Sequence, residues 1–275
     1  MKKVMFMIGT AAMLLLASCK SSPKVEERVC NIYGGLQDNV EAILQRHLSE
    51  YDAMDGVVIV METNSGRIRG MVGLECKDDS SYVRADSLAD VRRSSALVQT
   101  VSMLAALNSG KVKQDTNEKT PMQLITLYNA IANNGKMVAP QLYDSLRQTN
   151  EEAKVSSPQM ASSVNIKDIQ KMLEENVTNG QGKKAQSDLF AVAGKDGTTY
   201  NKDSTLTADF CGYFPARNPV YTVLVSVHRK EIPASGGGMA GAIFKEIAEF
   251  LYHRWSKSCR IPLRIYKNRA GFRCK

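Results

Sequence analysis

Cysteine and histidine are scarce in this chain of 275 residues, and neither occurs in a metal-binding pattern. The five cysteines after Cys19 are odd in number, widely scattered and without a C-x-x-C pair, which excludes a zinc framework and a dense disulfide scaffold. One or two disulfides remain open, and the pair that we favour is Cys259 with Cys274. The sequence therefore predicts no metal site and no cofactor. The histidines, which share no ligand spacing and are expected on the surface or in packing, are His47, His228 and His253.

Acidic residues are absent from Arg254 to Lys275, whereas that segment contains eight lysines and arginines. The formal net charge of +8 is therefore concentrated in a basic C-terminal tail, predicted over residues 253–275, and the rest of the chain is near neutral. This distribution argues against a nucleic-acid-binding protein. Two interpretations remain open, a solvated tail or a contact with anionic envelope polymers or lipid headgroups.

A long apolar run occurs at the N-terminus, where Lys2 and Lys3 precede "VMFMIGTAAMLLLAS" and Cys19. A charged start and an apolar stretch too short for a stable bilayer span are typical of a signal peptide. "LASC" at 16–19 resembles a bacterial lipobox, with cleavage before Cys19 and lipidation of that residue. The alternative is an ordinary signal peptide with a chance cysteine. We predict a signal over residues 1–18, a tether over 19–35, and an exported lipoprotein that faces the periplasm from either membrane.

The rest of the chain predicts an α+β fold with a central antiparallel sheet and helices on both faces. The segments 77–92 and 144–164 are polar and are expected to be loops. Thr120, Pro121 and Gly135 mark the ends of one helix, and Ser94 or Ser95 is expected to cap another. The expected helices cover 36–51, 95–108, 121–134, 165–179 and the segment after the glycines at 236–238. The expected strands lie near 56–62, 67–74, 189–199, 207–214 and 220–228.

Several of these segments together resemble the transpeptidase domain of penicillin-binding proteins, over residues 36–252. The stretches that carry the resemblance are "GVVIVMETNSGRIRGMV", "TPMQLITLYNAIANNGKMVAP", "VAGKDGTT", "ADFCGYFPARNPVYTVLVSV" and "SGGGMAGAIFKEIAEF", in the order of the family. The resemblance implies the penicillin-binding, β-lactamase-like fold. Because few residues lie between the helices at 95–108 and 121–134, most of the family's all-helical subdomain is expected to be missing.

The catalytic pair of the family is altered in this sequence. The family needs a serine and a lysine one helical turn apart, so that the amine takes the hydroxyl proton. "SALVQTVSMLAAL" at 95–107 aligns with that motif and has Ala96 at the serine position and Gln99 at the lysine position. A shifted frame that uses Ser94 or Ser95 places Leu97 or Val98 at the position of the base. The resemblance therefore implies that the catalytic pair is missing.

The family's other two motifs are also changed. "SVN" at 163–165 matches the S-x-N letters but follows the "ANNG" segment, so its order is wrong. The lysine-containing strand, which in the family binds the substrate carboxylate, keeps Lys195, Gly197 and Thr198 but has Asp196 in place of a threonine. Asp196 is expected to repel a carboxylate and to pair with Lys195. The strand is interpreted as a substrate-binding remnant.

Three functions are consistent with these observations. The first is a non-catalytic, penicillin-binding-protein-like envelope lipoprotein that binds peptidoglycan or proteins of cell-wall synthesis and division, with membrane contact through its lipid anchor. The second is an active serine acyltransferase, a transpeptidase or carboxypeptidase with an unidentified nucleophile. The third is the product of a decaying gene, against which the hydrophobic periodicity through residue 252 argues.

The lipobox predicts that lipid attachment depends on Cys19. Replacing Cys19 with Ala should leave an unlipidated precursor or release the protein into the soluble fraction, because the acyl chains anchor it. Metabolic labelling with a radioactive fatty acid measures this directly, with Cys30→Ala as the control. Unchanged labelling of the Cys19→Ala protein would refute the prediction.

Overall fold

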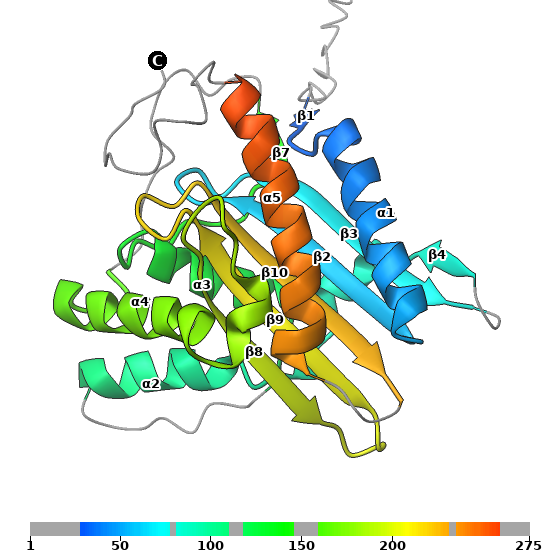
Figure 1. Cartoon of the computed structure of the whole chain (residues 1–275). Helices are drawn as coiled ribbons and strands as arrows, with labels where there is room; N and C mark the ends of the chain where they lie inside the picture. The colour runs from blue at the N-terminus through cyan, green and yellow to red at the C-terminus, as the bar shows by residue number, and fades with distance from the viewer. Residues whose placement is uncertain (1–27, 78–80, 110–117, 146–158, 231–234, 259–275) are drawn as a thin grey trace, which may run out of the picture.

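The computed structural model describes residues 28–77, 81–109, 118–145, 159–230 and 235–258. Its centre is a six-stranded antiparallel sheet with the order β4-β3-β2-β10-β9-β8, shown in Figure 1. The central antiparallel sheet predicted from the sequence is confirmed. The strands are β2 (Asp55–Glu62), β3 (Ile68–Cys76), β4 (Tyr82–Arg84), β8 (Ala193–Tyr200), β9 (Leu206–Phe214) and β10 (Tyr221–Arg229).

The helices cover both faces of this sheet (Figure 1). On one face lie α1 (Gly34–Glu50) and α5 (Gly241–Ser258), which follows a π-helical turn, η3 (Gly236–Ala240). On the other face lie α2 (Val98–Ser109), α3 (Pro121–Ala132) and α4 (Ser163–Thr178). Each face has its own apolar core, since side chains alternate between the two faces along every strand. The predicted assignment of helices to faces is confirmed.

Strand pairing joins the two halves of the sequence. The hairpin of β2 and β3 turns at Asn64, Ser65 and Gly66, as predicted. β2 then pairs with β10, so that Val58 lies opposite Val225. β9 is buried along its whole length, because it has a strand on each side and helices on both faces.

The helix α3 begins as the sequence indicates. The Thr120 hydroxyl accepts the Gln123 N–H at 3.1 Å, the Gln123 side chain accepts the Thr120 N–H, and Pro121 occupies the first turn. After the helix, Gly135 takes a φ of +87°, a left-handed conformation that favours glycine. These contacts are local in sequence, which is why the sequence predicted them.

Several predicted boundaries are wrong. The strand expected from 189 begins at Ala193, because the Leu189 N–H bonds the Ser187 hydroxyl in a turn and the Phe190 ring packs on Phe214. The helix expected from 95 begins at Val98. The helix expected from 165 begins at Ser163 and is capped by the Ser162 hydroxyl, which accepts the Asn165 N–H.

Three segments expected to lack regular structure contain some. The loop expected over 144–164 includes the end of β7 (Tyr143–Ser145) and the first residues of α4. The loop at 77–92 contains β4 and a 3-10 helix, η1 (Asp86–Asp90); the Tyr82 hydroxyl holds β4 by donating to Ala53 O at 2.6 Å. The tether expected over 19–35 contains β1 (Arg28–Cys30), which pairs with β7 (Tyr143–Ser145), and the start of α1. The partners β1 and β7 are distant in sequence, and the three residues of β4 are too few to show a period, so local patterns indicated neither β4 nor the pairing of β1 with β7.

The two shortest paired strands are β5 (Arg93–Ser94) and β6 (Glu118–Lys119). The cysteines with a described environment, Cys30, Cys76 and Cys211, are free thiols, and Cys19, Cys259 and Cys274 lie outside the described residues. Within the described ranges, no helix has both the length and the apolar character that crossing a membrane requires.

The hairpin turn between β2 and β3 predicts a large cost for a side chain at Gly66. Gly66 has a φ of +75°, and a Cβ added there would lie 2.3 Å from the Ala139 carbonyl oxygen. We expect Gly66→Ala to lower the free energy of unfolding by about 2 kcal/mol or more, measured by urea denaturation. The control Gly34→Ala, where an added Cβ has no atom within 4 Å, should change it by less than about 0.5 kcal/mol. Equal effects of the two substitutions would contradict this explanation.

Candidate active-site region

The beginning of α2 packs directly against the edge strand β8. The Ala96 N–H donates to the Thr199 hydroxyl at 3.0 Å, and a Cβ built on Gly197 would lie 3.1 Å from the Ala96 Cβ. The structure therefore brings Ala96 together with the Gly197 segment of β8, two regions that the sequence suggested as parts of one site. Gln99 lies one turn further along α2 with an exposed side chain.

Lys195 and Asp196 form the ion pair expected from the sequence. The Lys195 ammonium lies 2.9 Å from Asp196 Oδ1 and donates to the Asp196 carbonyl oxygen at 2.7 Å. Neighbouring side chains of a strand point to opposite faces, so this contact runs around the free edge of β8. Two of the three ammonium donors are thus used within the strand itself.

Other contacts also occupy the edge of β8. The Asn176 amide, from α4, donates to the Gly194 carbonyl oxygen at 2.9 Å. On the sheet face that η3 covers, rather than at the edge, the Thr198 hydroxyl accepts the Gly236 N–H at 2.9 Å. The carbonyl oxygens of Gly194 and Asp196, two residues apart on β8, therefore both accept hydrogen bonds from side chains of this chain.

Asp209 holds the beginning of α2 to the sheet, and the sequence analysis missed it. The Ser95 hydroxyl donates to Asp209 Oδ2 at 2.6 Å and accepts the Leu97 N–H at 3.2 Å. Neither serine caps the helix as expected, because α2 begins at Val98: the Ser95 hydroxyl bonds the Leu97 N–H in the turn before the helix, and Ser94 lies in β5. A possible signal was the single acidic residue in the apolar run of β9, "LTADFCGYF".

The carboxyl group of Asp209 is buried from solvent. Burial raises its pKa to about 6, although hydrogen bonds from Ser226 and Ser95 and the charges of Arg93 and His228 act in the opposite direction. Asp209 is therefore a structural acid beneath the site, whose burial is compensated by hydroxyl donors.

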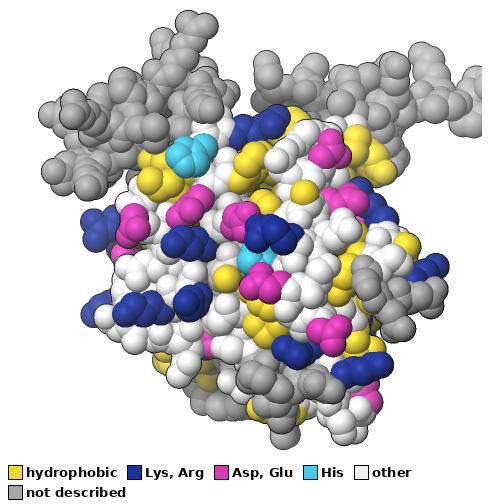
Figure 2. All heavy atoms as spheres, turned by 45° about the vertical axis from the view of Figure 1, so that its right-hand side comes forward, with side chains coloured by type: hydrophobic (Ala, Val, Ile, Leu, Met, Phe, Trp, Pro, Cys, Tyr) yellow, Lys and Arg dark blue, Asp and Glu magenta, His cyan; other side chains and the backbone are white. Residues whose placement is uncertain are grey.

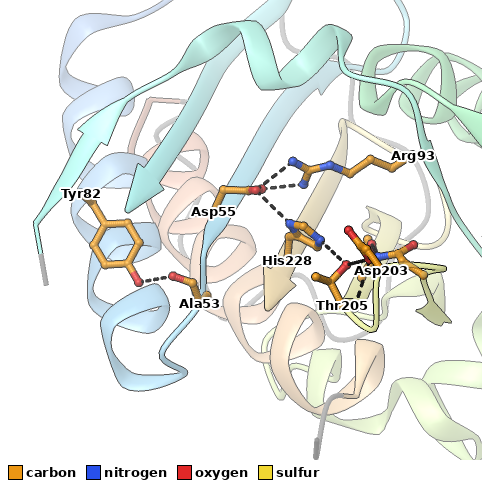
Figure 3. A network of polar contacts seen from close by, with 9 residues as sticks. Ala53, Asp55, Tyr82, Arg93, Asp203, Thr205 and His228 are labelled. Carbon is orange, nitrogen blue, oxygen red and sulfur yellow. Dashed lines mark hydrogen bonds and ion pairs between the residues drawn. The ribbon is translucent and has the colours of Figure 1, made fainter. Parts of the chain in front are cut away.

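A second polar network lies at the start of β2, as Figure 3 shows. Arg93 binds both carboxylate oxygens of Asp55, at 2.6 and 2.8 Å, and His228 Nδ1 lies 3.1 Å from Oδ2. The other ring nitrogen, Nε2, contacts the Thr205 hydroxyl at 2.8 Å. Burial alone would raise the pKa of Asp55, but the bonds from His228 and Arg93 outweigh it and the pKa is lowered. Both nitrogens of His228 are engaged in packing contacts, as the sequence predicted.

The other buried histidine, His47, contacts Glu246 through Nε2 at 3.0 Å, which joins α1 to α5. Within the described ranges, no three histidine, cysteine or acidic side chains are grouped so that they could hold a metal ion.

A large and a small hollow in the described part of the chain adjoin these polar networks. The larger, of about 650 Å³, is at the ends of β2, β3 and β10 and has a mixed lining of acids and bases that includes Asp52, Glu75 and Lys230. The smaller lies between Arg93, Ser95 and Asp209. Neither is lined by Ala96 or by Lys195.

Solved structures of similar fold share this arrangement of sheet and helices. The transpeptidase domain of the FtsI4 D,D-transpeptidase from Legionella pneumophila superposes with a TM-score of 0.64 and 20% identity, covering 81% of this chain and 98% of that one. The transpeptidase domain of penicillin-binding protein 3 from Burkholderia pseudomallei has a TM-score of 0.61 and 14% identity, covering 85% of this chain and 98% of that one. At these identities the comparisons establish the fold.

Sequence comparison identifies the family. The model of the penicillin-binding protein transpeptidase domain matches residues 100–249, more than half of the chain. The chain belongs to this family. The match begins directly after Gln99, so Ala96 and Gln99 lie outside it.

Curated relatives are similar over about half of the chain. A peptidoglycan D,D-transpeptidase FtsI homolog of Mesostigma viride is 27% identical over 158 residues, which are 48% of this chain and 26% of that protein. Penicillin-binding protein PbpB of Mycolicibacterium smegmatis is 26% identical over 156 residues, 49% of this chain and 24% of that protein. The chain thus spans about a quarter of the length of these relatives.

The raised pKa of Asp209 predicts a specific dependence of stability on pH. The folded chain binds the proton of the Asp209 carboxyl group more tightly than the unfolded chain does, so protonation stabilises the fold. This contribution to the free energy of unfolding is complete below the ordinary pKa of 3.8 and is lost as the pH rises through about 6. The free energy of unfolding of the parent, relative to that of Asp209→Asn, should therefore fall by about 2.4 kcal/mol between pH 4 and pH 7.

Urea denaturation of both proteins across this pH range measures the difference between their free energies of unfolding. The contributions of the other titrating groups cancel because both proteins contain them. Asp188→Asn, at an exposed site, is the control and should give a flat difference. A flat difference for Asp209→Asn as well would show that the carboxyl group is not held in a raised-pKa environment.

Proposed function

We propose that this chain is a non-catalytic member of the penicillin-binding protein transpeptidase family, held in the cell envelope as a lipoprotein. In this proposal residues 1–18 are the signal peptide, 19–35 the tether, 36–252 the transpeptidase-like domain and 253–275 the basic tail. The protein acts by binding peptidoglycan or a protein of the cell-wall synthesis and division machinery. The observation that carries the proposal is Ala96, a side chain without a nucleophilic atom at the start of α2 beside β8.

The missing base supports the same conclusion. Gln99 holds the position one turn after Ala96, and its neutral amide does not accept a proton near pH 7. Loss of nucleophile and base together removes the acylation step rather than slowing it, because the step needs both a lone pair and a proton acceptor.

The local hydrogen bonds of the site oppose acylation independently. The backbone N–H of Ala96 is already bonded to the Thr199 hydroxyl, so a ligand would have to displace this contact to use that donor. The Lys195 ammonium is bonded to Asp196, whose negative charge also repels a carboxylate ligand by about 1 kcal/mol at 4 Å in water and more in a drier cleft. A ligand would have to displace both contacts.

We expect no covalent adduct between the protein and β-lactams, measured by intact-protein mass spectrometry after incubation with penicillin. A catalytically active penicillin-binding protein treated in parallel is the positive control. A mass increase equal to one opened β-lactam would refute the assignment of Ala96, and the modified peptide would then identify the true nucleophile.

A series of repaired variants separates chemistry from binding. Ala96→Ser with Gln99→Lys should stay almost unreactive, because the S-x-N segment is still missing. Adding Asp196→Thr should first improve reversible β-lactam binding, because it releases Lys195 and removes a repulsive charge. Asp188→Thr, which removes an exposed acid three residues after η2 (Gln181–Ala185), is the matched control and should leave binding unchanged. Equal binding by the two Asp→Thr variants would contradict the proposed role of Asp196.

A further inference from the structure

We propose that one end of the molecule docks on a bilayer of anionic phospholipids. The docking surface, named here the arginine–tyrosine surface, consists of Tyr33, Arg67, Tyr143, Arg217 and Arg254. This inference rests on the envelope location proposed above, but it depends neither on the lack of catalysis nor on acylation of Cys19.

The pairing of the strands places two turns of the arginine–tyrosine surface at the same end of the sheet. Tyr221 of β10 pairs with Glu62 of β2 and with Phe214 of β9, and the Thr63 N–H bonds the Val220 carbonyl at 2.9 Å. The turn at 63–67, which contains Arg67, and the turn at 215–220, which contains Arg217, are therefore at the same end of the sheet.

The chain entering α1 and the chain leaving α5 join the same end, as Figure 1 shows. The Tyr33 N–H bonds the Arg69 carbonyl at 3.1 Å, and the Arg254 guanidinium lies 6.0 Å from the centre of the Tyr33 ring. Tyr143 of β7 pairs with Cys30 of β1. These contacts gather segments from five parts of the sequence.

The charge of this surface suits an anionic partner. Arg217 and Arg254 are exposed and Arg67 is half-buried. Glu62, which lies between the turns, is bonded to Arg69 at 3.1 Å and to the Ser65 hydroxyl at 2.5 Å, so that its charge is offset. By contrast, acidic and basic side chains are interspersed over the face of the molecule in Figure 2.

Exposed tyrosines favour a lipid surface over a purely ionic partner. Tyr33 is 45% exposed and Tyr143 is 55% exposed, although both are large and largely apolar. An aromatic ring with a hydroxyl group is suited to the boundary between headgroups and acyl chains, where one part of it is apolar and the other is hydrated. Tyrosines beside arginines therefore match a membrane interface.

The position of the chain ends gives an independent argument. The described chain begins at Arg28 of β1 and ends with α5 at Ser258, both at this end of the molecule. The sequence after Arg254, to Lys275, adds seven further lysines and arginines and no acid. The attraction between a basic residue and anionic lipid decreases within a Debye length. The basic residues of this segment therefore contribute to binding only if the arginine–tyrosine surface faces the bilayer.

The test measures binding of the full chain carrying Cys19→Ala to sedimented lipid vesicles. One vesicle preparation is phosphatidylcholine alone and the other also contains phosphatidylglycerol. We expect stronger binding to the anionic vesicles, weakened by salt. The apolar segment near the N-terminus is present in every variant, so differences in vesicle binding among the variants reflect the contribution of the arginine–tyrosine surface.

A charge-reversal pair with a matched control locates the contact. Arg217→Glu with Arg254→Glu should lower the partition coefficient on anionic vesicles by tenfold or more, since about fivefold is expected for each cation lost. Lys202→Glu with Lys230→Glu changes the net charge equally at the opposite end of the sheet, where Tyr200 pairs with Leu206, and should leave the coefficient within about twofold. Circular dichroism and thermal unfolding check that both pairs fold, and Arg217→Gln with Arg254→Gln replaces the first pair if it does not.

Three results would overturn the proposal. Equal losses for the two pairs would show that net charge alone matters, and equal binding to both vesicle types would show that anionic lipid is not recognised. Arginine-dependent sedimentation with isolated peptidoglycan, without binding to vesicles, would assign the surface to the wall polymer. Lipid labelling at Cys19 and penicillin acylation test the proposed function separately, so either can fail without changing these results.

Discussion

The pairing of β2 with β10 is the contact on which the rest of the structure depends. It joins residues 55–62 to residues 221–228, with eight consecutive partners, and it places the hairpin of β2 and β3 in the same sheet as β8, β9 and β10. Once these strands pair, each face of the sheet presents a continuous apolar surface for helices. Because the partners lie far apart in sequence, the chain must close a long loop before this pairing stabilises it.

The junction of α2 with β8 is held by hydrogen bonds from residues of the candidate site. Ser95 bonds the buried Asp209, and Ala96 bonds Thr199, so the helix is held against the strand by hydrogen bonds. The same strand uses Lys195 to bond its neighbour Asp196. In our proposal these contacts stabilise the packing of α2 against the sheet and take no part in catalysis, and the protein acts by binding partners through its surface.

Much of the fold could be predicted because its signals are local. Alternating apolar residues indicate β9 and β10, the turn at 64–66 marks a hairpin, and Thr120 with Pro121 marks the start of α3. The short strand β4 was not predicted, although its partner β3 directly precedes it, because three residues are too few to show a period. The pairing of β1 with β7 was not predicted because the two strands are short and lie far apart in the sequence. For the candidate site, sequence identified Ala96, Lys195 and Asp196 but not Asp209.

The sequence by itself determined the class of fold, the residue at the proposed nucleophile position, Ala96, and the charge of the C-terminal segment, because residue type and spacing are properties of the chain alone. The tertiary structure decided that Ser95 contacts Asp209, that the Lys195 side chain passes around the free edge of β8, and that Tyr33 and Arg254 share one surface. Those contacts join residues from different elements or depend on which strand is at the edge of the sheet. Hydrogen bonds and ring contacts form over a few ångströms, so they depend on distances that only the packed chain establishes.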